Sequence, residues 1–165
     1  PLDEEPGMHD NSMTHYMELL ASNQPWNLIL FMAIPVILAE FIAVTELYIL
    51  FSRNYHGLWR RLNRWAGVAV GVYFLGVFAY LLVNAVWPIT AAGAWRGIAD
   101  VIAVGFYLLG IVPLGGIALL ELGVLGRGLD DQGHLKLHAS FVGLFLIVAH
   151  IAMIFGMLNP ALLMA

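Results

Sequence analysis

Six ionisable side chains lie inside the long apolar stretches of this sequence, and their chemical types suit metal or proton binding. They are Glu40, Glu46, Asp100, Glu121, His138 and His150. A charged side chain at the centre of a bilayer costs about 2.5–3.5 kcal/mol even on the mildest scale, so such residues mark candidate functional sites. Imidazole and carboxylate groups are also common ligands of Zn, Mn and Fe.

Two histidines and two glutamates are predicted to lie at the same depth, near the inner ends of the helices. This inner layer consists of Glu46, Glu121, His134 and His138. His134 and His138 are four residues apart, so both imidazoles project from the same helix face. Two imidazoles with two carboxylates predict a divalent-metal site. The alternative is a polar cluster in which Glu121 pairs with an Arg or Lys and the histidines face water.

Glu40 and His150 are predicted to lie together near the middle of the membrane. A carboxylic acid and an imidazole at this depth could share a proton or bind a ligand, and we expect both to face the bundle interior. The alternative is a hydrogen bond between the first and fourth helices that serves packing. Asp100 is expected close to the outer surface, where it would be solvated.

Methionines extend the possible chemistry toward a soft metal ion. Met153 and Met157 follow His150 at positions i+3 and i+7, and Met32 lies in the outer half of the first apolar run. The segment before that run adds four further donors: His9, Met13, His15 and Met17. Thioether and imidazole donors together favour Cu(I), whereas a methionine stripe is otherwise ordinary apolar packing. We therefore expect Cu or Zn as the bound ion.

Membrane-spanning helices must position these residues, because the composition does not suit a soluble domain. The 165 residues are 61% hydrophobic and 11% charged, with a mean hydropathy of +0.85. Soluble domains carry about 25% charged residues. A span needs roughly 20 apolar residues, and four runs reach this length: 26–51, 65–87, 97–125 and 135–158. Short connections make consecutive helices antiparallel neighbours, so we predict an all-α, four-helix transmembrane bundle.

The basic residues predict the orientation of this bundle. Six of the seven fall in the loops after the first and third runs, and only Arg96 lies on the opposite side. The six are Arg53, Arg60, Arg61, Arg64, Arg127 and Lys136. The positive-inside rule places those loops in the cytoplasm and both termini outside. We expect a bacterial inner membrane, with both termini in the periplasm.

The flanking segments are short. Residues 1–7 (PLDEEPG) resemble a vector-derived scar before Met8, and residues 8–25 and 159–165 form the outer tails. Within the first tail, apolar residues recur at helical spacing between Ser12 and Ala21. They predict a short amphipathic helix on the outer membrane surface, with Asn11 or Ser12 as its N-cap.

Glycines and prolines in the apolar runs predict close packing and kinks. Gly67, Gly71 and Gly76 recur in the second run, where small residues let helix backbones approach closely. Pro35 and Pro113 lie near mid-membrane in the first and third runs. A proline removes a helical hydrogen bond, so each is expected to kink its helix.

The leading functional hypothesis is a small membrane protein that binds a transition-metal ion and transports or delivers it. The outer His/Met segment would collect the ion, Glu40 and His150 would hold it at mid-membrane, and the inner layer would receive it. The absence of cysteine excludes thiolate sites, and the net charge of -4 gives no basic field for nucleic acid. No catalytic motif is present, so no catalytic residues are predicted.

The four-span layout and the intramembrane histidines also resemble small membrane b-type cytochromes, which hold haem between histidines on facing helices. The resemblance implies haem b, with His150 and His138 as candidate ligands, or an exchange of electrons with quinone. Only the fourth run carries intramembrane histidines, so a bis-His haem needs a methionine beside His150 or a homodimer. A third hypothesis is a non-catalytic subunit whose glycine-rich faces dock against other membrane proteins.

Overall fold

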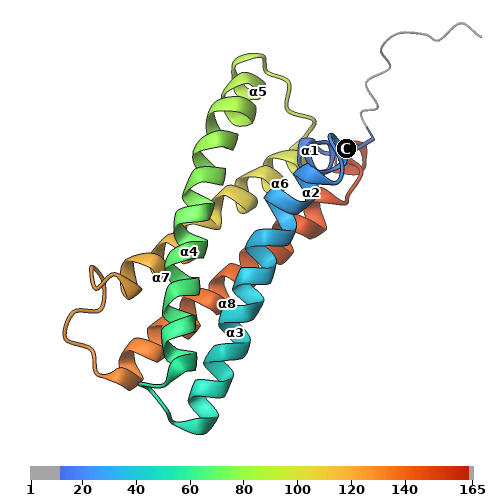
Figure 1. The fold of residues 1–165 in the computed structure, drawn as a ribbon. Coiled ribbons are helices and arrows are strands. Elements are labelled where there is room, and N and C mark those ends of the chain that lie inside the picture. The colour runs from blue at the N-terminus through green and yellow to red at the C-terminus, as the bar shows by residue number, and fades with distance from the viewer. Residues whose placement is uncertain (1–11, 164–165) are drawn as a thin grey trace, which may run out of the picture.

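The computed structural model describes residues 12–163, and every regular element in that range is helical. Four helical segments are long and apolar enough to cross a membrane: Trp26–Ser52, Leu58–Ala91, Ile98–Glu121 and Asp131–Gly156. They run alternately up and down the bundle (Figure 1). The helical class and the four candidate spans are therefore confirmed, whereas the orientation stays a prediction.

Three of the four segments are interrupted. The first contains α2 (Trp26–Leu28), a π-helical turn η1 (Ile29–Ala33) and α3 (Ile34–Ser52). The second contains α4 (Leu58–Leu81), a π-helical turn η2 (Leu82–Val86) and α5 (Trp87–Ala91). The third contains α6 (Ile98–Leu109) and α7 (Ile111–Glu121), and the fourth is the continuous α8 (Asp131–Gly156). A short helix stands at each end of the described chain: α1 (His15–Ala21) and η3 (Pro160–Leu163).

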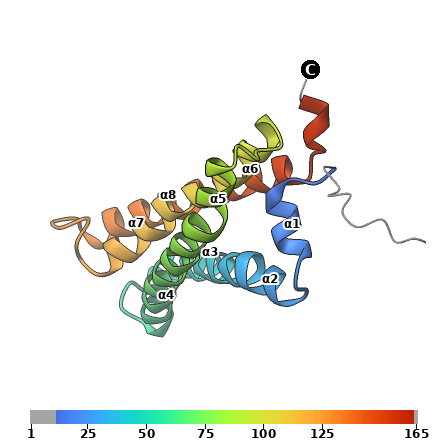
Figure 2. The ribbon, with the colours of Figure 1, turned by 90° about the horizontal axis from the view of Figure 1, so that it is seen from above.

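The four segments pack unevenly. The helix α4 packs against α3 and α7, and α8 packs against α6 and α7, whereas α3 and α8 touch over much less of their length. Figure 2 shows α1 crossing the end of this arrangement beside α6. We call the end with α1 and the 92–97 loop the α1 end, and the end with the 53–57 and 122–130 loops the arginine end.

The second segment begins earlier than the apolar run predicts. It starts at Leu58 after Gly57, which has extended backbone as the N-cap. Arg60, Arg61 and Arg64 therefore lie on the first turns of α4 and not in a loop, which corrects the predicted span. Arginine and leucine are good helix formers, so this charged stretch continues the helix although it ends the apolar run.

Both predicted proline sites are associated with irregular helix geometry. Pro35 follows η1, and its missing N–H leaves the Phe31 carbonyl free to accept the Tyr107 hydroxyl. Before Pro113, α6 ends at Leu109 and α7 begins at Ile111. The carbonyl freed by Pro35 therefore joins the first segment to the third.

The predicted N-terminal helix exists, but its cap and its position differ from the expectation. Thr14, and not Ser12, is the N-cap of α1, and its side chain accepts from the Met17 N–H, whereas Asn11 lies outside the described residues. The Thr14 hydroxyl also donates to the Gly156 carbonyl, at 2.7 Å. Because this bond joins α1 to α8, the helix is docked on the bundle itself and is not held by a membrane surface alone.

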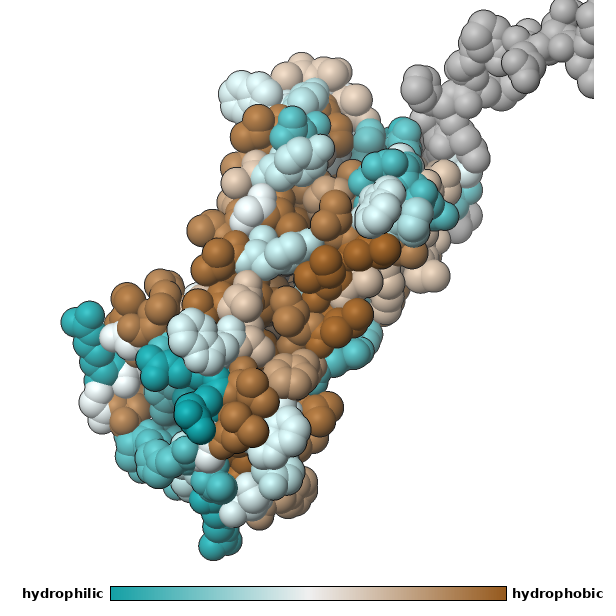
Figure 3. Space-filling view, in the orientation of Figure 1, coloured by the Kyte–Doolittle hydropathy of each residue, from teal (hydrophilic) through white to brown (hydrophobic). Residues whose placement is uncertain are grey.

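Apolar side chains cover the middle of the bundle surface. Figure 3 shows a brown band between hydrophilic side chains that gather at the arginine end and around α1. Many large apolar residues are exposed, among them Val44 at 65%, Val72 at 60% and Ile147 at 61%. An exposed apolar belt of this extent is the surface that a lipid bilayer would cover.

Candidate functional sites

The inner-layer residues do come together at the arginine end. The imidazole of His138 is fully buried on α8. Its Nδ1 contacts the Glu46 carboxylate of α3, and its Nε2 lies 3.3 Å from Oε1 of Glu121 on α7. Among residues 12–163, Nε2 has no hydrogen-bond partner. One imidazole thus stands between two buried carboxylates from different helices.

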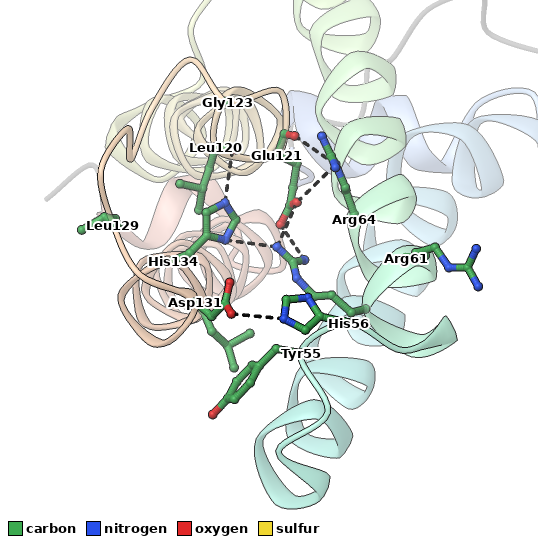
Figure 4. A pocket seen from close by; sticks show the side chains of 12 residues that line it. Tyr55, His56, Arg61, Arg64, Leu120, Glu121, Gly123, Leu129, Asp131 and His134 are labelled. Atoms are coloured by element: carbon green, nitrogen blue, oxygen red, sulfur yellow. Dashed lines mark hydrogen bonds and ion pairs between the residues drawn. The ribbon is translucent and has the colours of Figure 1, made fainter.

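Arginine completes this cluster. Arg60 of α4 holds Glu121 through two contacts of 2.9 and 3.1 Å. Its guanidinium also lies 3.1 Å from Nδ1 of His134. Figure 4 shows Glu121, Arg64 and His134 gathered in this region. The Arg64 Nε donates to the main-chain carbonyl of Glu121, at 3.2 Å. The cluster therefore matches the predicted alternative in the pairing of Glu121 with an arginine, but His138 is fully buried and does not face water as that alternative required.

The metal expectation for the inner layer gains no support from this geometry. Among residues 12–163, no group of three or more His, Cys, Asp or Glu is arranged to hold a metal ion. The Arg60 guanidinium also occupies both oxygens of Glu121. A positive group at this carboxylate opposes the approach of a cation by like-charge repulsion.

Two positioning residues were not singled out from the sequence. The hydropathy pattern assigns Arg60 to a loop and gives no signal for Asn63. The fully buried Asn63 donates to the Ile42 carbonyl at 3.1 Å and to the Thr45 hydroxyl at 2.8 Å. Asn63 therefore joins α4 to α3 at Thr45, the residue that precedes Glu46. Arg60, Asn63 and Gly67 recur at helical spacing, so they lie on one face of α4. That periodicity is the sequence signal from which the roles of Arg60 and Asn63 could have been predicted.

A cavity of about 410 Å³ opens beside the cluster at the arginine end. His56 and Asp131 approach each other across it at 3.5 Å, whereas Arg61 points away from the other labelled side chains in Figure 4. The cavity is lined by Tyr55, His56, Arg60, Arg61, Arg64, Leu120, Glu121, Gly123, Leu129, Asp131, His134 and Leu135. Glu121 and His134 therefore line a cavity at the polar arginine end of the molecule.

Asp100 lies in a second polar cluster at the α1 end, and its predicted solvation is wrong. The carboxylate is fully buried. It accepts the His15 main-chain N–H and contacts the His15 Nδ1, each at 2.6 Å, and it accepts the Arg96 main-chain N–H at 3.2 Å. Because α1 folds over the first turn of α6, His15 covers the carboxylate. The positive end of the α6 dipole further stabilises the negative charge.

Glu40 and His150 share a groove, but they do not face the bundle interior. Both side chains are exposed, which overturns that expectation. They line a cavity of about 220 Å³ between α3 and α8 together with Met32 and Met153. This groove exists because α3 and α8 make little contact. Met157 is 70% exposed and does not line it.

The histidine and methionine residues of the outer segment have different environments. His15 is held by Asp100, and Met17 packs against the hydrophobic core. Met13 is 37% exposed and precedes α1, and its carbonyl accepts from the Arg96 guanidinium. His9 lies outside the described residues, as do Met8 and the predicted scar at 1–7. The collecting role of this segment stays a prediction.

Comparison with known proteins places the chain in a family. Residues 11–165 match the model of a family of unknown function, DUF6803. The chain belongs to this family. No curated protein and no solved structure matches the chain significantly.

Proposed function

We propose that this DUF6803 protein is an integral membrane protein that binds a soft transition-metal ion, Cu(I), in the groove between α3 and α8, and passes it on. The observation that supports the proposal best is the state of the His150 ring. Its Nδ1 lies 2.6 Å from the Leu146 carbonyl. A carbonyl oxygen only accepts, so Nδ1 carries the proton and Nε2 keeps its lone pair.

That arrangement is typical of a histidine that binds a metal. Metal-ligating histidines almost always donate their second ring N–H to a carbonyl, a carboxylate or water, which fixes the tautomer. The lone pair of His150 Nε2 is therefore available as a ligand. The exposure of the side chain means that no helix of residues 12–163 covers it.

The neighbouring side chains favour a soft ion. Met32 and Met153 bring two thioethers to the same groove as His150. Thioether and imidazole donors select Cu(I) over hard cations. Glu40 lines the groove as well and would balance the charge of a bound cation. An apolar groove at the bundle surface also lets the ion pass to a second copy of the chain or to another membrane protein.

The proposal is tested by anaerobic titration of the purified chain in detergent with Cu(I), in competition with a chromogenic chelator. We expect one tight site, with affinity at least about tenfold lower in His150→Ala and in Met153→Leu, because each removes one ligand. His56→Ala and Met157→Leu are the matched controls. His56 is an exposed loop histidine, and Met157 lies outside the groove.

Two outcomes would overturn the proposal. In the first, wild-type protein binds Cu(I) no more tightly than His150→Ala. In the second, the affinity depends on the residues before α1 and is unchanged by both groove variants. A Soret absorption band in the purified protein would instead favour the haem hypothesis. His150 would then be the better candidate ligand, because both ring nitrogens of His138 contact carboxylates.

A further inference from the structure

Another cavity lies at the α1 end, and Tyr16 and Tyr107 form a wall that it shares with the proposed copper groove. Its volume is about 430 Å³. It exists because α4 packs against α7 while the following η2 and α5 diverge from α6, as Figure 1 shows at the top of the bundle. It is lined by His15, Tyr16, Glu18, Leu19, Ser22, Leu81, Asn84, Ala85, Pro88, Ile89, Arg96, Val104 and Tyr107.

The size and lining of this cavity suit a small organic ligand. Ligand pockets measure roughly 300–1,000 Å³ and are mostly apolar, with a few fixed polar groups. Here the walls carry aliphatic side chains such as Leu81 and Val104, and two aromatic rings. The rings of Tyr16 and Tyr107 lie 5.3 Å apart between centroids. Such a wall favours a flat ring that carries an apolar chain.

One polar group in the cavity is fixed in orientation. The Nδ1 of His15 is held at 2.6 Å by the fully buried Asp100 carboxylate. The Nε2 of His15 has no hydrogen bond to any residue of the described range, and the side chain is 19% exposed. Because the buried carboxylate fixes the imidazole through Nδ1, Nε2 is left as a positioned hydrogen-bonding atom.

The charges around His15 disfavour an anionic ligand. Arg96 is the one guanidinium in the cavity wall, and it is paired with Glu18 at 2.5 Å. Asp100 adds a second carboxylate behind His15. A phosphate or carboxylate head would therefore meet more negative than positive charge. A neutral head with a carbonyl or hydroxyl oxygen meets no such repulsion.

We propose that this cavity binds the ring of a membrane-soluble isoprenoid quinone, with a ring oxygen hydrogen-bonded to Nε2 of His15. As a lone pair, Nε2 accepts from the hydroxyl of the reduced form, and as N–H it donates to the carbonyl of the oxidised form. The ring lies beside Tyr16 and Tyr107. The apolar chain follows the aliphatic wall of η2 and α6 toward the lipid.

The proposal is tested on the full chain in detergent with a short-chain benzoquinone and a short-chain naphthoquinone as probes. Equilibrium dialysis should give saturable binding of one molecule per chain. Ala85→Phe fills the cavity and should abolish binding. Ala79→Phe is the matched control, because Ala79 is exposed on α4 outside the cavity and this variant should bind as wild type does.

A second variant tests the role of the imidazole. In His15→Asn the amide nitrogen takes the place of Nδ1, so the partner of Asp100 is kept while Nε2 is lost. We expect about tenfold weaker quinone binding, the effect of one hydrogen bond. Lyso-phosphatidylethanolamine serves as a competing amphiphile. Equal binding of this lipid, or unchanged quinone binding in Ala85→Phe, would overturn the proposal. His150→Ala separates this site from the copper groove, since it should leave quinone binding intact.

Discussion

The Nε2 atom of His138 lies 3.3 Å from Oε1 of Glu121, and neither side chain is more than 1% exposed. The same imidazole contacts Glu46 through Nδ1. These contacts link α8 to α7 and to α3, and Arg60 adds α4. A single charge cluster therefore joins all four candidate spans at the arginine end.

Glu121→Gln should destabilise the bundle. The substitution leaves the guanidinium of Arg60 in a partly buried site without its carboxylate, and the loss of one partner of a buried ion pair costs about 3–5 kcal/mol. Unfolding in detergent, followed by circular dichroism, should show a clearly lower midpoint temperature than wild type. Glu40→Gln is the control, because Glu40 is exposed and has no such partner. Equal midpoints for the two variants would show that the cluster does not stabilise the fold.

Gly71→Ala and Gly76→Ala should have opposite effects on stability. A Cβ at Gly71 would lie 2.4 Å from the Ala118 Cβ and 2.7 Å from the Leu114 carbonyl, so α4 and α7 must separate. A Cβ at Gly76 meets nothing within 4 Å. Alanine there should stabilise the helix by about 0.5–1 kcal/mol. The comparison uses midpoints of thermal unfolding, and loss of stability in both variants would contradict this account of α4.

The stability of the α1 end should fall at high pH. Burial raises the pKa of Tyr16 from 10.0 to about 12. The folded state therefore keeps the phenol proton that the unfolded state loses above pH 10. As a result, the free energy of unfolding decreases as the pH rises from 10 to 12. The two-unit shift corresponds to about 2–3 kcal/mol. Unfolding between pH 8 and pH 12 should show a smaller decrease for Tyr16→Phe than for wild type, with Tyr55→Phe as the control.

The predicted orientation is open to a direct test. Reporter fusions at the C-terminus should report the outer compartment, and fusions between residues 53 and 57 should report the cytoplasm. The expected pattern follows from the arginines at one end of the bundle. A cytoplasmic C-terminus would place the proposed copper groove and the proposed quinone cavity nearer the opposite faces of the membrane, and would reverse the proposed direction of metal transfer.

Composition and residue spacing alone determined the helical class, the number of candidate spans and the order of the ionisable residues along the bundle axis. Depth follows from a rise of about 1.5 Å per residue along a helix, so Glu46, Glu121 and His138 could be assigned to one layer before any contact was known. The pattern of small residues likewise predicted the close helix contacts at Gly67 and Gly71, but it was wrong for Gly76, which meets nothing within 4 Å.

The tertiary structure alone decided the direction in which each side chain faces and the identity of its partner. Rotation of a helix about its axis depends on its neighbours, and the apolar runs are hydrophobic on all sides, so sequence could not show that Glu40 and His150 face a groove. The burial of Asp100 depends on α1 folding back over α6, a contact between residues far apart in sequence. Arg60 reaches Glu121 because α4 begins within the charged stretch, where the helix propensity of arginine and leucine continues the helix although hydropathy does not predict it.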